Sequence, residues 1–477
     1  MLFNSIPFLI FFPIVVMVYW AIPQSWRRYW LLAASYYFYM CWNARYALLL
    51  LLSTAITYVS GRIMFCKGAR FRKWVVATSF ALNLSILFFF KYFNFVFDTL
   101  ARFLAKVGVV FLPPQLDILL PVGISFYIFQ ALSYTMDVYR RQIEPEKNFF
   151  TYALFVSFFP QLVAGPIERS SNLLPQLKCP RGGDTLEFTR GFQLMLWGFF
   201  EKVVIADTLA GIVDVVYNNY TQMNGLQILG GTVLFAFQIY CDFGGYSHIA
   251  IGAAQVLGFR LMDNFRQPYF STSVKEFWRR WHISLSTWFK DYLYLPLGGN
   301  RCGKFRKAAN TMIVFLLSGL WHGANWTYVV WGGLNGLFQL TGRKTKHQKN
   351  IFKTICAILI TFCLVDFTWL FFRASSMTQA VEMMKRLFVL PETFSVKMLL
   401  KGMGFTKANL PVVILALLVL FIVDILHEKG IAIRRQIIAV MPVWARWGVY
   451  IAACETILLQ SFVRFGQPAT AFMYFQF

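Results

Sequence analysis

Residues 318–326 read Ser-Gly-Leu-Trp-His-Gly-Ala-Asn-Trp and place His322 inside a long apolar stretch. The 477-residue chain holds only five histidines, and a second one, His282, has similar surroundings: residues 277–284 read Phe-Trp-Arg-Arg-Trp-His-Ile-Ser. Ionisable groups within a bilayer are costly and usually line a cavity or a reaction path. Histidine also titrates near neutrality and can move protons. These two histidines are therefore the first candidates for chemistry.

The apolar runs around them predict an all-α polytopic membrane protein. Hydrophobic residues make up 58% of the chain and charged residues 14%, whereas a soluble domain has roughly 25% charged residues. A spanning helix needs roughly 20 apolar residues. The candidate runs are 6–22, 29–42, 46–60, 74–97, 116–137, 149–165, 190–215, 226–241, 244–258, 310–321, 325–341, 351–373, 409–427 and 444–463.

Several of these runs are too short to span a membrane alone. We expect 29–42, 149–165 and 310–321 to be tilted, re-entrant or half-helices, which survive where they are packed in protein or line a cavity. The stretches 98–111 and 376–389 suit helices that lie at the membrane interface. The chain is expected to form one transmembrane domain over 1–477, with a catalytic core segment at 235–340. The first run has no basic region before it and no small-residue cleavage site, so it is expected to be a retained helix.

The net charge of +24 comes from short basic clusters between the apolar runs. The strongest cluster lies at 62–73, and others lie at 27–28, 140–141, 343–353 and 434–435. This pattern fits the positive-inside rule and argues against a nucleic-acid partner. If every cluster faces the cytoplasm, the N-terminus lies outside. A basic cytoplasmic mouth would also attract an anionic, phosphate-bearing donor, and composition does not separate the two explanations.

Cysteine spacing indicates neither a metal site nor a disulfide framework. The eight cysteines are scattered and none forms a CxxC pair. We expect no bound metal and no permanently bound cofactor.

Between residues 235 and 340 the apolar runs carry most of the polar side chains. Gln238 and Asp242 lie one helical turn apart, and Gly244-Gly245 is expected to break or kink the helix after them. Asp242 is either the structural partner of an arginine or a carboxylate of the catalytic site, since buried carboxylates usually pair.

The run 274–294 is predicted to be one amphipathic helix. Arg279, His282 and Ser286 would then share one face. The helix would end in the loop 296–301, whose Arg301 could meet a ligand phosphate. Arg279 and Arg280 could do the same if they face the cytoplasm, although an anchoring role at the interface fits them equally.

The His322 segment is more apolar still. Ser318, His322 and Asn325 are predicted to share a helix face, and Gly319 and Gly323 would leave room beside the imidazole. The structural alternative is a histidine hydrogen-bonded within a helix interface. That alternative is stronger for His248, which follows the expected Gly-Gly break.

Two further polar residues, Glu201 and Lys202, are adjacent in the sequence. Their side chains point to different sides of a helix, so each is expected to pair with another helix.

The chain has no GxSxG, GxxxxGK[ST] or HExxH motif. A histidine acting as base on an incoming hydroxyl, with a second polar group stabilising the oxyanion, is the chemistry that these residues favour.

The segments 277–286, 293–301 and 319–323 together resemble the membrane-bound O-acyltransferases, most closely the bacterial branch concerned with alginate O-acetylation. The similarity extends to the opening residues 1–5, to 160–169, 240–252 and 367–374, and to the closing residues 474–477.

The resemblance implies a ring of about 11 transmembrane helices, with re-entrant and interfacial helices, around a central funnel or pore. The family's invariant histidine maps onto His322, and the second motif histidine maps onto His282.

The leading hypothesis is a membrane O-acetyltransferase in a bacterial inner membrane. Acetyl would pass from cytoplasmic acetyl-CoA, often through an extracytoplasmic hydrolase-like partner, to a secreted polysaccharide. His322 would act at the thioester carbonyl and His282 would assist, with Asn325, Ser286, Asp242, Arg279 and Arg301 as candidate substrate-binding residues. The alternatives are a sister enzyme that transfers D-alanyl to teichoic acid, and a transporter or flippase with a histidine proton relay.

Overall fold

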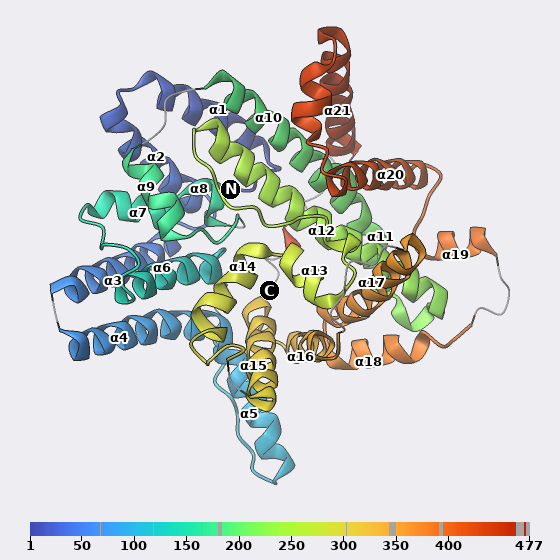
Figure 1. The fold of residues 1–477 in the computed structure, drawn as a ribbon. Helices are drawn as coiled ribbons and strands as arrows, with labels where there is room; N and C mark the ends of the chain where they lie inside the picture. The colour runs from blue at the N-terminus through green and yellow to red at the C-terminus, as the bar shows by residue number, and fades with distance from the viewer. Residues whose placement is uncertain are drawn as a thin grey trace. The chain divides into compact units, whose positions relative to one another are not determined.

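The computed structural model describes residues 1–477 except 67, 118, 164, 180–183, 302, 343–349, 391–394, 464–471 and 474–477. Most of the basic cluster at 343–353 and the closing residues 474–477 therefore lie outside the described residues. All regular secondary structure in the described part of the chain is helical (Figure 1). The chain divides into two compact units.

The first unit comprises Met1–Gly191 and Ala253–Met262. Its helices are α1 (Ile6–Ala21), α2 (Gln24–Met40), α3 (Tyr46–Cys66), α4 (Ala69–Leu87), η1 (Phe88–Tyr92), α5 (Phe93–Lys106), α6 (Ile124–Tyr139), α7 (Phe149–Ser157), α8 (Phe159–Leu162), α9 (Ser170–Lys178) and the first part of α10 (Thr185–Phe199). The run 149–165 is broken at Phe158, between α7 and the four-residue α8, as expected for a half-helix.

The second unit comprises Phe192–Gly252 and Asp263–Gln476 and holds both candidate histidines. Its remaining helices are η2 (Phe200–Ala206), α11 (Asp207–Asn218), η3 (Tyr220–Gln222), α12 (Gly225–Val256), η4 (Pro268–Phe270), α13 (Val274–Arg280), α14 (Ile283–Phe289), η5 (Lys290–Tyr294), α15 (Lys304–His322), α16 (Trp326–Thr341), α17 (Ile351–Arg373), α18 (Met377–Arg386), α19 (Val396–Gly402), α20 (Asn409–Glu428), η6 (Ile433–Ile437), η7 (Ile438–Val440) and α21 (Val443–Val463).

Five helical stretches among the described residues are long and apolar enough to cross a membrane. They are Tyr46–Phe65, Ala69–Lys106, Gly225–Val256, Ile351–Arg373 and Asn409–Glu428. In α12, 72% of the most apolar window is buried, against 17% in Ala69–Lys106. Helix α12 is therefore an interior helix, and the stretch Ala69–Lys106 presents its apolar side chains outward, as a lipid-facing helix does.

Helix α12 is continuous through Gly244-Gly245, so of the two predicted outcomes, a break or a kink, the break does not occur. Gly245 lies directly against α10 and η2, where a methyl group on it would lie 2.6 Å from the Gly198 carbonyl oxygen and 2.9 Å from the Lys202 nitrogen. Gly245 therefore serves a close helix crossing, which needs the absence of a side chain at this position.

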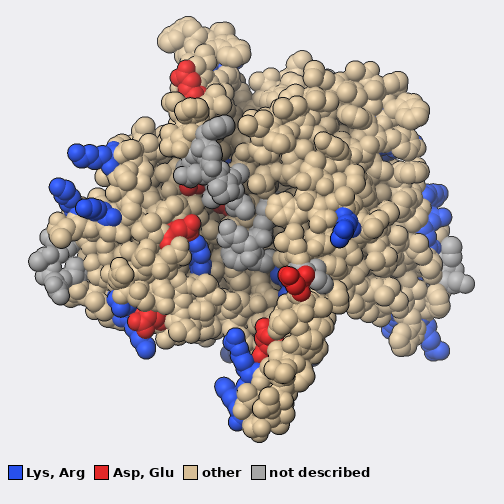
Figure 2. Space-filling model, turned by 180° about the vertical axis from the view of Figure 1, so that it is seen from behind, with Lys and Arg blue, Asp and Glu red and all other residues tan. Residues whose placement is uncertain are grey.

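Charged side chains are sparse on the face shown in Figure 2, where most of the surface is tan. Large apolar side chains are exposed along α20, among them Leu415, Leu418 and Ile422. Exposed apolar surface of this kind is typical of helices that face lipid.

Candidate functional site

His282 lies between two short helices, not within one. Helix α13 ends at Arg280 and α14 begins at Ile283, and His282 has φ 43° and ψ 55° in the left-handed region. The predicted continuous helix over 274–294 is therefore wrong, and Arg279, His282 and Ser286 do not share one helix face. This turn directs the imidazole inward, where His282 is 1% exposed.

Asn264 holds this turn in place. Its backbone carbonyl accepts the Ile283 N–H at 2.9 Å, and its side-chain Oδ1 accepts the Ser284 hydroxyl at 2.7 Å. Its Nδ2 donates to Ser247 Oγ at 3.1 Å. Asn264 is 1% exposed. Sequence reasoning missed it, and its only signal was a polar residue between apolar ones, shortly before Pro268.

Asn264 also sets the tautomer of His282. The same Oδ1 accepts the Ser284 backbone N–H at 3.3 Å. This atom of the Asn264 side chain is therefore its oxygen, which can only accept hydrogen bonds. His282 Nδ1 lies 3.4 Å from it and must carry the proton to donate there. The lone pair is then on Nε2.

His322 is the last residue of α15, and it is 3% exposed. Its imidazole is surrounded by the rings of Trp321 and Trp331, each with its centroid at 5.0 Å, and by Phe372 at 5.3 Å. Aromatic walls of this kind exclude water from the imidazole. Gly323 follows with an extended backbone, and a methyl group on it would collide with the Tyr328 ring.

The two histidines lie side by side in the folded chain. Their ring centroids are 6.3 Å apart, although the residues are 40 positions apart in the sequence. Phe243 packs edge-on against His282 at 4.6 Å, and Trp321 lies 5.8 Å from it. Both imidazoles therefore share one buried, aromatic surrounding.

Asn325 and Ser286 have local structural contacts. Helix α15 ends at His322, so the predicted shared face of Ser318, His322 and Asn325 does not form. Asn325 is the N-cap of α16: its Oδ1 accepts the Thr327 N–H at 3.1 Å, and its Nδ2 donates to the Ser375 carbonyl at 3.1 Å. Ser286 Oγ donates to the Trp281 carbonyl at 3.4 Å.

Asp242 forms a buried ion pair. Its Oδ1 accepts the Lys202 ammonium at 2.6 Å, and its Oδ2 accepts the Met473 backbone N–H at 2.9 Å. The same ammonium donates to Asp207 at 2.8 Å. The structural partner of Asp242 is therefore a lysine, where the sequence suggested an arginine.

Glu201, next to that lysine, bonds to His248 Nδ1 at 2.6 Å. The prediction that Glu201 and Lys202 pair with other helices is confirmed. Both residues lie in the π-helix η2, a wider turn than an α-helix and often found at functional sites.

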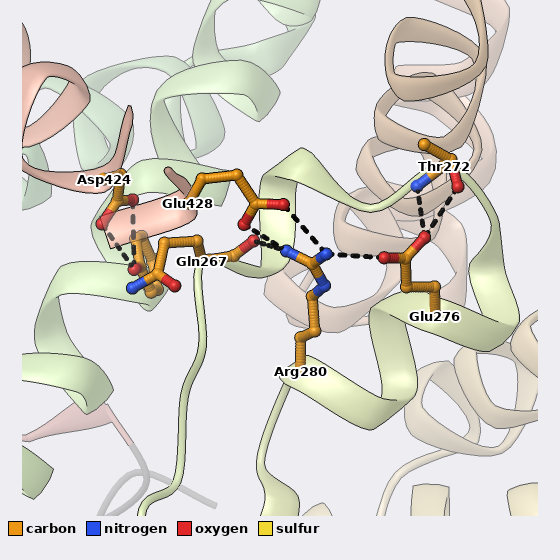
Figure 3. A network of polar contacts seen from close by, with 7 residues as sticks. Gln267, Thr272, Glu276, Arg280, Asp424 and Glu428 are labelled. Carbon is orange, nitrogen blue, oxygen red and sulfur yellow. Dashed lines mark hydrogen bonds and ion pairs between the residues drawn. The ribbon is translucent and has the colours of Figure 1, made fainter. Parts of the chain in front are cut away.

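The arginines beside His282 differ in their surroundings. Figure 3 shows Arg280 between two carboxylates, with N–H groups 2.6 Å from Glu276 and 2.6 Å from Glu428. Arg279 and Arg301 are exposed. Arg280 therefore joins α13 to the end of α20. Arg279 and Arg301, in contrast, are open to solutes.

Comparison with known proteins matches this chain to one family. The model of the membrane-bound O-acyltransferase family matches residues 3–364. The probable alginate O-acetylase AlgI of Pseudomonas putida is 40% identical over 398 residues, covering 81% of this chain and 80% of that protein. The peptidoglycan O-acetyltransferase of Helicobacter pylori is 34% identical over 425 residues, covering 81% of this chain and 79% of that protein.

A more distant relative is the teichoic acid D-alanyltransferase of Bacillus subtilis, which is 27% identical over 274 residues, covering 53% of this chain and 68% of that protein. These matches favour an enzyme over the transporter alternative. The family model matches most of this chain, and the described helices include apolar ones long enough to cross a membrane. The chain therefore belongs to the membrane-bound O-acyltransferase family and is a multi-pass membrane O-acyltransferase.

Proposed function

We propose that this enzyme takes acetyl from cytoplasmic acetyl-CoA and passes it across the membrane for O-acetylation of a secreted polysaccharide. The observation that carries the proposal is the buried pair His282 and His322, with ring centroids 6.3 Å apart in an apolar, aromatic surrounding. Relatives named as acetyl transferases to alginate and to peptidoglycan, aligned over about four fifths of the chain, support the acetyl group and the carbohydrate acceptor.

In the proposed reaction His322 acts as the base. The oxygen of an acceptor hydroxyl attacks the thioester carbonyl carbon, and its proton passes to the imidazole. When the tetrahedral intermediate collapses, the carbon–sulfur bond breaks and the thiolate takes that proton. The products are an acetyl ester and free coenzyme A. His282, with its proton held on Nδ1 by Asn264, orients a reactant through Nε2.

The basic clusters support an anionic donor on the cytoplasmic side. Acetyl-CoA carries phosphates, and exposed arginines such as Arg279 and Arg301 are suited to contact them. The proposed site is reached from both sides, through a funnel within a ring of about 11 transmembrane helices in a bacterial inner membrane. A hydrolase-like partner outside the cytoplasm would receive the acetyl group and select the polysaccharide.

D-Alanyl transfer from a carrier-protein thioester to teichoic acid is the second candidate. The relative with that name aligns over only about half of the chain, whereas those named O-acetylase and O-acetyltransferase align over four fifths. The two candidates share the thioester chemistry and differ in the donor.

The test is acyl transfer by the purified protein in lipid nanodiscs. Free thiol release and acceptor labelling are measured with acetyl-CoA and, in parallel, with a D-alanyl carrier-protein thioester. We expect turnover with acetyl-CoA that His322→Ala abolishes. The control is His427→Ala, at the exposed end of α20. Turnover that survives His322→Ala would overturn the assignment, and activity with the D-alanyl thioester alone would establish the second candidate.

A further inference from the structure

Helix α16 carries a stripe of buried polar atoms at every fourth residue. The atoms are Thr327 Oγ1, Trp331 Nε1, Asn335 Oδ1 and Gln339 Oε1, and none of them has a hydrogen-bond partner among the described residues. The first three of these residues are at most 1% exposed. Residues four apart lie on one face of a helix, and 12 residues rise by about 18 Å. We refer to these four residues as the α16 stripe.

The stripe is not explained by packing alone. The neighbouring face of α16 packs on α15, where Gly319 and Gly332 bring the two helix backbones together. Asn335 Nδ2 donates to the Trp331 carbonyl at 2.9 Å and to Thr368 at 3.1 Å, so this amide already joins α16 to α17. An unsatisfied buried polar atom costs roughly 1–3 kcal/mol. Asn335 shows that α17 covers part of this face, so each unpaired atom of the stripe has to be considered by its own surroundings.

Trp331 is the member of the stripe whose ring packs on His322. Its ring lies 5.0 Å from the His322 ring and nearly perpendicular to it, at 86°. Phe372 at 5.1 Å and Trp369 at 5.8 Å hold the indole on its other sides. The indole nitrogen can only donate a hydrogen bond, so the molecule it meets must bring an acceptor oxygen.

We propose that Trp331 is a catalytic residue whose indole N–H donates to the carbonyl oxygen of the acyl thioester beside His322. This inference rests on the proposed function. When the acceptor hydroxyl adds to the carbonyl carbon, negative charge develops on that oxygen. A fixed donor in a surrounding that excludes water stabilises this charge without reorganising. Two observations carry this assignment: the Trp331 ring packs on the His322 ring, and its buried indole N–H has no partner among the described residues.

The test removes the N–H while keeping an aromatic ring. We expect Trp331→Phe to lower kcat by about 100-fold, the typical effect of removing one oxyanion donor, with KM for acetyl-CoA changed little. The matched control is Trp278→Phe, which removes another buried indole N–H without a partner among the described residues. Trp278 packs on Trp331 at 5.6 Å. We expect Trp278→Phe to keep kcat within a few-fold of the parent value.

A second substitution separates the hydrogen bond from packing. Replacing Trp331 by 3-benzothienylalanine keeps the shape of the indole and puts sulfur in place of N–H. The inference predicts the same loss of kcat as in Trp331→Phe. A parent-like kcat in the benzothienyl variant, or a rise in KM alone, would overturn it. Failure of the proposed function is distinguishable, because the parent enzyme would then not turn over acetyl-CoA or would not depend on His322.

Discussion

At the scale of single residues, burial decides the charge of His282. The residue lies between two seven-residue helices, outside the candidate spans. Burial lowers the pKa of its imidazole from 6.5 to about 3, because the cation would lose its hydration. The ring is therefore neutral near pH 7. A neutral imidazole with its proton on Nδ1 suits a residue that orients a reactant, and it leaves the proton transfer to His322.

The lowered pKa of His282 predicts an acid-sensitive fold. Between about pH 6.5 and pH 3 the unfolded chain binds a proton at this position and the folded chain does not. The free energy of unfolding therefore falls as the pH drops below 6.5, by at most about 1.4 kcal/mol per pH unit from this group. We expect His282→Asn, which tolerates the left-handed backbone, to flatten the decline of the thermal midpoint between pH 7 and pH 5.

The measurement is the thermal midpoint of both proteins in one detergent at half-unit pH intervals. Parallel curves for the parent protein and His282→Asn would contradict the buried neutral imidazole. The test is independent of catalysis, since it reads stability alone.

At the scale of helices, the crossing of α12 over the end of α10 depends on one of two adjacent glycines. The position that a methyl group would take on Gly245 is occupied by backbone atoms of Gly198 and Lys202. On Gly244 the nearest atoms would lie at 3.8 Å, an ordinary contact. The crossing also places Glu201 and Lys202 opposite His248 and Asp242, so it positions the ionic network of this unit.

The two glycines therefore form a matched pair of variants. Alanine is favoured over glycine within a helix by about 1 kcal/mol, so Gly244→Ala is expected to leave the thermal midpoint unchanged or raise it. Gly245→Ala must push the helices apart and is expected to destabilise by about 1–3 kcal/mol. Differential scanning fluorimetry in detergent compares them. Equal midpoints for the two variants would show that the crossing is not tight.

The helices were largely predictable from the sequence, and the turns at the site were not. Long apolar runs in the sequence predict helices such as α17 and α20, because both lipid and the protein core require apolar side chains. The left-handed turn at His282 depends on hydrogen bonds that Asn264, which is 18 residues earlier, accepts. The break after His322 depends on the Tyr328 ring against Gly323. Such tertiary contacts leave no periodic signal in the sequence.

Some residues of the candidate site could also be predicted from the sequence, and others could not. The sequence singled out His282 and His322 because an ionisable residue within an apolar stretch is rare, and the structure brings these two together. It could not show Asn264 or Trp331, since an asparagine in a connecting segment and a tryptophan among many have ordinary structural roles. Their importance comes from which atoms lie against the two imidazoles.

At the scale of the whole molecule, charge and apolar surface together predict how the chain crosses the membrane. The net charge is +24, and each of the five candidate spans contains an apolar window of 18 residues with at most two charged residues. Basic residues near the ends of spans remain in the cytoplasm. Helix α20 is the clearest case, because its 20 residues match the hydrocarbon thickness and only 22% of its most apolar window is buried.

Arg434 and Arg435 are the only adjacent basic pair near either end of α20, whereas the lysines before Asn409 are scattered. The end of α20 that this pair follows is therefore predicted to face the cytoplasm and the Asn409 end the outside. Lys429 and Lys407 are exposed at the two ends. In a chain whose native cysteines are replaced by serine, we expect Lys407→Cys to react with a membrane-impermeant maleimide on intact cells. We expect Lys429→Cys to react only after permeabilisation. The reverse pattern would place Arg434 and Arg435 outside, and this pair would then not mark the side from which the anionic donor approaches.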